Sequence, residues 1–352
     1  MSKQPALHTR PPATMGPGRS ASLFGAAAAA LVTGGIFLGS RNLANFDAAL
    51  VGYAVATVLM AFGVTYRTVA WSRSPAARRY LIGGWKALSS PGPASRRDLA
   101  GPKTLVSTVL LQRFIAKRSN GRWLAHQGLF WGVVMATAIT FPLTFGWIHF
   151  RAVEGAASGY WVFLLGTRTV KLDALSPLGW IVFHGLDVAA VLVIGGCLYF
   201  VKRRWAERRT NRIHFSKDLL PLVALLAISV TGLALTVSSA LLSGRFYPLL
   251  AFVHMCTVVL TLVWIPFGKF FHTIQRPAMI GVHLYKQSNL DGSRAFRCRS
   301  CGEPVETTGF VEDLQSTLSE LGLAYGDWIE TCPRCKRIER GVQYRAQVKA
   351  GF

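Results

Sequence analysis

The sequence predicts an all-α, polytopic membrane protein: a bundle of about six transmembrane helices, followed by a small cytoplasmic domain with four cysteines. Three observations support this prediction. Of the 352 residues, 51% are hydrophobic and only 16% are charged, which is typical of a chain that crosses a bilayer several times. Apolar runs long enough to span a membrane recur along the chain. Two CxxC pairs stand apart from these runs, near the C-terminus.

The net charge of +23 is distributed between the apolar runs. Lysine and arginine concentrate in alternate connections, as the positive-inside rule describes for cytoplasmic loops. We therefore expect a multi-pass protein of the cytoplasmic (inner) membrane with both termini in the cytoplasm. The lipid bilayer accounts for the charge, so we expect no nucleic-acid partner.

The composition divides the chain into three parts. Residues 1–20 are polar and rich in Pro and Gly, which predicts a mobile cytoplasmic tail. Residues 21–276 are expected to form the transmembrane bundle. Within it, we expect a basic cytoplasmic loop at about 72–122 and a haem-binding core at about 120–276. Residues 277–352 are expected to form the cytoplasmic metal-binding domain.

Six apolar runs are candidate spans, at 21–40, 46–71, 123–150, 177–201, 218–243 and 247–277. A cleaved signal peptide is the alternative for the first run, although no A-x-A sequence closes it. Residues 151–176 are expected to form an outer loop at the membrane interface. The segment 104–118 is too short to span, and it is expected to form an amphipathic helix that lies in the headgroup plane or docks a soluble partner.

The last run carries His254 and His272, eighteen positions apart. On one continuous helix this spacing is about five turns, or roughly 27 Å, so both imidazoles would face the same side. Two interfacial histidines are the simpler alternative. However, ionisable residues within a membrane segment favour a functional role, and imidazole is a common axial ligand of haem iron.

The expected orientations of the helices place the histidines in pairs. His126 and His272 would lie near the inner face, and His184 and His254 about two turns below the outer face. Two pairs at matched depths suit two stacked haem b groups, and bis-histidine ligation favours electron transfer. His149 is the rival of His184 as the outer ligand.

Two further features lie on the third and fourth runs. Gly128 and Gly132 form a GxxxG sequence, which either permits close helix contact or accommodates a flat macrocycle. Asp187, one turn deeper than His184, is a candidate for accepting and releasing protons. A hydrogen bond between helices is its simpler interpretation.

The segment IPFGKFFHTIQRP (265–277), with His254 upstream, resembles the last core helix of the gamma subunit of respiratory nitrate reductase. It is also similar to the membrane cytochrome b subunits of heterodisulfide reductase and of sulfite-reduction complexes. The resemblance covers about residues 120–277. It implies two haem b groups, with His254, His272 and His126 as ligands, and electron exchange between membrane quinone and a soluble iron–sulfur or molybdenum partner. Ala136 stands where the family pattern has another histidine, a departure that either removes the outer haem or moves its ligand to His184.

The four C-terminal cysteines form a CxxC-x30-CxxC pattern of Cys298, Cys301, Cys332 and Cys335. This spacing predicts a tetrahedral four-sulfur metal site, and cytosolic thiols favour ligation over disulfides. Zinc and iron share this geometry. The two knuckles resemble rubredoxin, an electron carrier. However, Lys336 stands where rubredoxins have Gly, and FVEDLQSTLSELGL (310–323) is predicted to be a helix, so a structural zinc ribbon is favoured.

Together these features predict a di-haem b-type cytochrome, the quinone-reactive subunit of an oxidoreductase complex. It would transfer electrons between membrane quinone and a cytoplasmic iron–sulfur or other redox partner. The alternative is a haem-free membrane scaffold or sensor whose zinc ribbon recruits a cytoplasmic partner.

Overall fold

The computed structural model describes most of the chain, at residues 18–89, 106–207, 215–290, 295–323 and 325–349. The predicted tail lies outside the described residues except for residues 18–20. The predicted basic loop is described without residues 90–105.

The chain divides into two compact units. We call the first, Arg19–Thr68 with Leu110–Thr273, the membrane unit. We call the second the cysteine unit, and it consists of Met1–Gly18, Val69–Val109 and Ile274–Phe352. Residues between the second and third predicted spans therefore share a unit with the cysteines.

Among the described residues, six helices are long and apolar enough to cross a membrane. They are α1 (Gly18–Gly39), α2 (Val51–Ser72), α7 (Asn120–Thr144), α8 (Pro177–Glu207), α9 (Leu220–Leu241) and α10 (Tyr247–Trp264). Large apolar side chains point outward from them, for example Leu31 and Leu260, which are 77% and 70% exposed. Such surfaces suit contact with lipid. The prediction of a multi-pass membrane protein built on a bundle of helices is confirmed.

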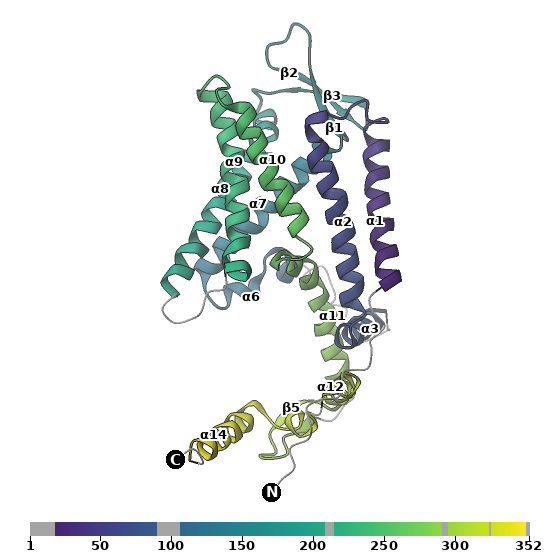
Figure 1. Ribbon diagram of the computed structural model, residues 1–352, viewed down its shortest axis with the longest axis vertical. Helices are drawn as coiled ribbons and strands as arrows, with labels where there is room; N and C mark the ends of the chain where they lie inside the picture. Colours follow the sequence, from purple (N-terminus) through teal and green to yellow (C-terminus); the bar gives the residue numbers. More distant parts are fainter. Residues whose placement is uncertain (1–17, 90–105, 208–214, 291–294, 324, 350–352) are drawn as a thin grey trace. The chain divides into compact units, whose positions relative to one another are not determined.

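Helices α7 to α10 pack in sequence order, side by side (Figure 1). Glycines bring the backbones of α7 and α8 close together. A Cβ atom at Gly132 would lie 2.8 Å from the carbonyl oxygen of Ala189, and one at Gly128 would lie 3.2 Å from that of Leu192. The GxxxG sequence therefore serves contact between α7 and α8, as small residues commonly do in membranes.

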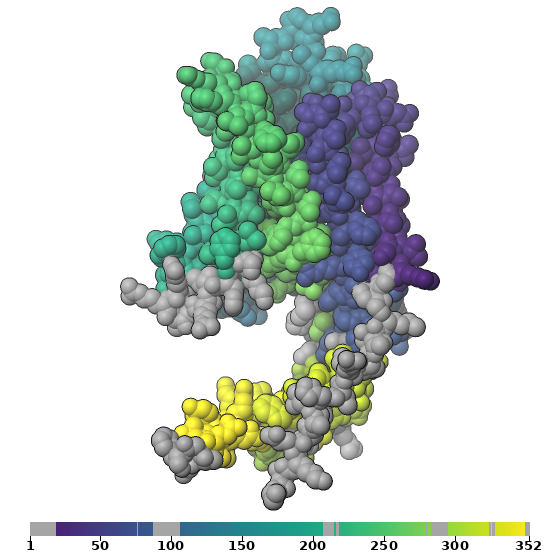
Figure 2. All heavy atoms as spheres, in the orientation of Figure 1, coloured from purple at the N-terminus to yellow at the C-terminus, as the bar shows by residue number. Residues whose placement is uncertain are grey.

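Helix α2 packs against α10, and Figure 2 shows their surfaces meeting. A Cβ atom at Gly52 would lie 3.1 Å from the sulfur of Met255, and one at Gly63 would lie 2.7 Å from a ring carbon of Pro266. Small residues on α2 thus admit the side chains of α10 and of the turn that follows it.

The expected outer loop and the last residues of the third predicted span form a three-stranded antiparallel sheet of β1 (Ile148–Ala152), β2 (Gly159–Leu164) and β3 (Thr167–Asp173). The sheet lies at the end of the bundle where α8 and α10 begin (Figure 1). Leu165 and Gly166, both with positive φ, connect β2 to β3. Positive φ at both turn positions matches the twist of a two-residue hairpin. The prediction of a loop missed this hairpin, although the aromatic and β-branched residues around the Leu-Gly pair favour strands.

The expectation of one continuous last helix is wrong. Helix α10 ends at Trp264, a 3-10 turn follows at Lys269–Phe271, and α11 (His272–Leu290) is a separate helix. Pro266 explains the break, because proline removes a helical donor and restricts the residue before it. The spacing of His254 and His272 therefore does not correspond to five turns of one helix.

The expected amphipathic helix at 104–118 is also interrupted. Its described part forms a π-helical turn at Val106–Leu110 and a short helix, α6 (Arg113–Ala116). Gln112 between them has a φ of 47°. A residue in this left-handed region cannot continue a right-handed helix.

In the cysteine unit, α3 (Pro75–Ser89) packs on α12 (Thr308–Glu320). The guanidinium of Arg79 donates to Ser316 and lies 3.2 Å from Glu320 and 3.8 Å from Asp313. The rings of Tyr80 and Phe310 are 6.0 Å apart. The remaining elements are β4 (Ala295–Arg297), β5 (Pro304–Thr307), α13 (Gly326–Ile329) and α14 (Pro333–Lys349).

Candidate functional site

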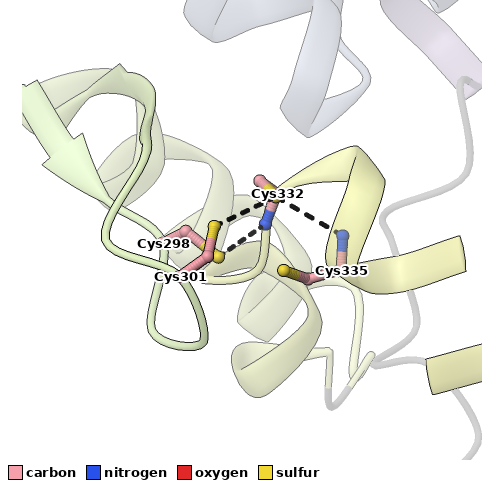
Figure 3. Close-up of side chains that lie close together, drawn as sticks. All are labelled: Cys298, Cys301, Cys332 and Cys335. Atoms are coloured by element: carbon pink, nitrogen blue, oxygen red, sulfur yellow. Dashed lines mark hydrogen bonds between the residues drawn. The ribbon is translucent and has the colours of Figure 1, made fainter. Parts of the chain in front are cut away.

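The four predicted cysteines come together in the cysteine unit (Figure 3). Cys298 and Cys301 follow strand β4, and Cys332 and Cys335 lie at the start of α14. Their sulfur atoms all lie within 4.8 Å of one another. The prediction that these residues form one cluster able to hold a metal ion is confirmed.

Backbone N–H groups point at the sulfurs of the cluster. The N–H of Cys332 donates to Sγ of Cys298 at 3.2 Å, and that of Cys335 donates to Sγ of Cys332 at 3.4 Å. The first bond is the main reason that the pKa of Cys298 falls to about 6, because a donor stabilises the thiolate. Thiolate is the form that ligates metals.

The segment between the two knuckles forms a helix, α12, as predicted. Behind the second knuckle, Lys336 lies 5.9 Å and Arg340 5.6 Å from the ring centroid of Trp328. Lys336, the residue that departs from the rubredoxin pattern, thus contacts an aromatic ring in this domain. Both contacts are cation–π interactions.

His254 of α10 faces helix α9. Its Nδ1 lies 2.9 Å from Oγ1 of Thr231, and that hydroxyl donates to the carbonyl oxygen of Ala227 at 2.7 Å. Since the hydroxyl proton is used on Ala227, the hydroxyl accepts the Nδ1 proton of His254. Nε2 then carries the lone pair.

His272 is the first residue of α11, after the break in the last span. Its Nδ1 lies 2.6 Å from the carbonyl oxygen of Lys269. A carbonyl only accepts, so Nδ1 holds the proton and Nε2 carries the lone pair. Arg67 stabilises this break by donating to the carbonyl of Pro266 and by stacking 4.3 Å from the ring centroid of Phe271.

His184 and Asp187 lie together on α8. Nδ1 of His184 is 3.2 Å from Oδ2 of Asp187, and Oδ1 of Asp187 accepts the hydroxyl proton of Thr236 on α9 at 2.7 Å. The expected hydrogen bond between helices is therefore present. The ring of Trp180 lies 5.1 Å from that of His184.

These bonds also set the levels of the histidines along α9. Asp187 is level with Thr236, and His254 is level with Thr231, five residues or about 7.5 Å further from the sheet. His184 lies three residues from Asp187 on the sheet side, so about 12 Å of helix axis separates it from His254. The equal depth expected from counting residues along α8 and α10 does not follow from these contacts.

The two other candidates lie elsewhere in the membrane unit. His126 lies in the second turn of α7, with its ring 6.4 Å from that of Phe200 on α8. His149 lies on β1 instead of on a spanning helix, stacked 4.8 Å from the ring of Phe163. Burial and the nearby charge of Arg151 lower the pKa of His149 below its ordinary value.

Sequence reasoning missed three residues that position these sites: Thr231, Thr236 and Arg67. The two threonines were visible as polar residues inside an apolar run, and Arg67 as a cation within the second span. Their partners depend on how the helices are rotated, which local sequence does not specify.

Comparisons of the chain with family models, curated proteins and solved structures find no match. The resemblance to the nitrate reductase gamma subunit stays a prediction.

Proposed function

We propose that the protein is a di-haem b-type membrane cytochrome that transfers electrons between membrane quinone and a cytoplasmic iron–sulfur or other redox partner. The observation that carries this proposal is shared by His184, His254 and His272. Each has its Nδ1 within hydrogen-bonding distance of a fixed oxygen. Such bonds orient the ring and direct Nε2 toward a metal, as at most protein sites where histidine binds iron or zinc.

In this proposal, His126 and His272 would hold the inner haem, and His254 would hold the outer haem with His184 or His149 as its partner. Ligation by His184 would require α8 to shift along α9, because about 12 Å of helix axis separates His184 from His254. The haem groups, when bound, would supply one-electron transfer across the membrane. The residues of the chain fix the ligating nitrogen atoms: Thr231 sets the tautomer of His254, and the carbonyl of Lys269 sets that of His272.

Asp187 would accept or release the proton that accompanies quinone chemistry. Its carboxylate is held from two sides, by the hydroxyl of Thr236 and by the imidazole of His184. Oδ2 faces Nδ1 of His184, so a proton could pass between the two groups along this hydrogen bond.

The cytoplasmic side is assigned to the cysteine unit by charge. Helix α3, which belongs to this unit, carries Arg78, Arg79 and Lys86 and no acidic residue, and cytoplasmic segments beside membrane spans carry such an excess. A soluble redox partner would then meet the protein on this side, near the four-cysteine site that binds zinc or iron.

The test is a reduced-minus-oxidised visible spectrum of the purified chain, with a pyridine haemochrome count and metal analysis on the same sample. We expect two haem b groups per chain, and we expect the variants His254→Ala and His272→Ala each to lose part of this haem. His8→Ala, in the predicted tail, is the matched control and should keep both. His184→Ala and His149→Ala then identify the outer partner of His254.

A haem-free scaffold or sensor is the second candidate. The observation that favours it is the cysteine cluster, whose unit also includes helix α3 and so presents a folded surface to a partner. A sample with one bound zinc and no Soret absorption would exclude the cytochrome and leave this second candidate.

A further inference from the structure

A hollow of about 460 Å³ lies where the short helix α6 meets the start of α7 in the membrane unit. Leu111, Arg113, Ala116, Lys117 and Trp123 line it. The lining is therefore partly apolar and partly cationic, and none of the functions considered above uses it.

The wall of this hollow is fixed by hydrogen bonds. The carbonyl oxygen of Leu111 accepts two of them, from Nε1 of Trp123 at 2.6 Å and from the side-chain amide of Gln127 at 3.1 Å. Both donors belong to α7. The left-handed backbone of Gln112 turns the chain from Leu111 into α6. These contacts tie the cationic helix to the first turns of the spanning helix.

Two cations and no acidic residue are among the residues that line the hollow. Arg113 and Lys117 are four residues apart in and beside α6, and neither side chain forms a salt bridge with a described residue. The sequence contains no Asp or Glu from residue 99 to residue 153. An anion in the hollow would thus meet two cations and no carboxylate among the lining residues.

The position of Trp123 relates the hollow to the bilayer. It lies in the first turn of α7, one of the six candidate spans. Tryptophan at the end of a span favours the headgroup level. The next residue, Leu124, is 68% exposed and begins the lipid-facing surface of that helix.

We propose that this hollow binds the headgroup of an anionic phospholipid. The phosphate is held by Arg113 and Lys117, and the glycerol and upper acyl carbons lie against Leu111, Ala116 and the ring of Trp123. An apolar wall beside two cations suits an amphipathic phosphate ester better than a free anion. The site is independent of whether the chain carries haem.

The test uses the full chain in a neutral detergent, titrated with phosphatidylglycerol and followed by native mass spectrometry. The variant Arg113→Gln/Lys117→Gln removes both charges and should weaken the tightest lipid adduct about 30-fold, from the loss of two cation–phosphate attractions. The matched control, Arg168→Gln/Lys171→Gln, removes one arginine and one lysine from β3 and should leave that adduct unchanged. Circular dichroism melting checks that both variants fold.

Three outcomes would overturn the proposal. An equal loss of phosphatidylglycerol binding in the β3 control would indicate that the lipid binds through general surface charge and not in this hollow. Equal binding of phosphatidylcholine would indicate an apolar site with no headgroup selectivity. Full displacement of phosphatidylglycerol by inorganic phosphate at the same concentration would indicate a site for a free anion.

Discussion

At the scale of single residues, one hydroxyl group decides how His254 can act. Thr231 donates its proton to the backbone of its own helix and accepts from Nδ1 of His254. Gly232, the next residue, leaves room for the ring, since a Cβ atom there would lie 3.4 Å from Cε1 of His254. These neighbours fix both the tautomer and the position of the imidazole before any ligand binds.

Replacing Thr231 by valine keeps the volume but removes the acceptor. We expect haem affinity at His254 to fall about 10- to 100-fold, which is the usual effect of removing the hydrogen-bond partner of a metal-ligating histidine. Haem titration of the purified apoprotein measures this affinity. Thr231→Ser should restore the affinity. Thr140→Val, which removes a hydroxyl bonded within α7, is the control. Unchanged affinity in Thr231→Val would remove this threonine from the site.

The two candidate sites differ in how far sequence could predict them. Each CxxC pair lies within one short turn, which brings its two sulfur atoms together. The spacing in the sequence was therefore enough to identify Cys298, Cys301, Cys332 and Cys335 as one set. The histidines depend on tertiary contacts. The partner of His254 lies on α9 and that of His272 in an irregular turn, whereas His184 bonds to Asp187 on its own helix. Nothing in the local pattern fixes the rotation or offset of one helix against the next.

At the scale of elements, the interface of α7 and α8 depends on glycine at particular positions. A Cβ atom at Gly196 would lie 2.6 Å from the carbonyl oxygen of Ala125 and equally close to Leu129, whereas one at Gly195 would meet nothing within 4 Å. The two neighbouring glycines therefore have opposite tolerance for a side chain.

This difference gives a paired prediction. Gly196→Ala should force the helices apart and destabilise the bundle by about 1–3 kcal/mol. Gly195→Ala should be neutral or slightly stabilising, because alanine favours the helix. Thermal unfolding of each variant in detergent measures both effects. Equal midpoints would mean that α7 and α8 do not pack through Gly196.

Helices that depend on a long apolar composition could be predicted from the sequence, whereas helix breaks and turns that depend on single residues could not. Length and hydropathy identified all six candidate spans. Pro266 divides the last run into α10 and α11, although the apolar pattern continues across it. The β2–β3 hairpin was missed because its aromatic residues suit a membrane interface as well as they suit a strand.

At the scale of the whole molecule, the cysteine unit has a small apolar core. Its buried hydrophobic residues among those described include Val311 and Ile329 in addition to Cys298 and Cys332. Two of these four side chains are candidate metal ligands, so the cluster occupies much of the core. Small domains of this kind commonly depend on bound metal for folding.

Removing the metal should therefore act on one unit only. In Cys301→Ser/Cys335→Ser we expect metal content to fall below one per chain and backbone hydrogen exchange in α12 to rise about 100-fold or more. Exchange in α8 should not change. Cys256→Ser, in α10, is the control for loss of a thiol. Exchange in α12 equal to that of the wild type would show that the fold of this unit does not need the metal.

The contact of Arg79 with α12 has a consequence for the timing of synthesis. Arg79 and Asp313 are separated by 234 positions. At translation rates of about 5–20 residues per second, α3 waits roughly 12 to 47 s for its partner helix to be made. During that interval Tyr80 and its neighbours lack the surface of α12 against which they pack. A ribosome that stops before α12 would leave α3 as an exposed surface for chaperones and proteases, long after its adjacent membrane spans were inserted.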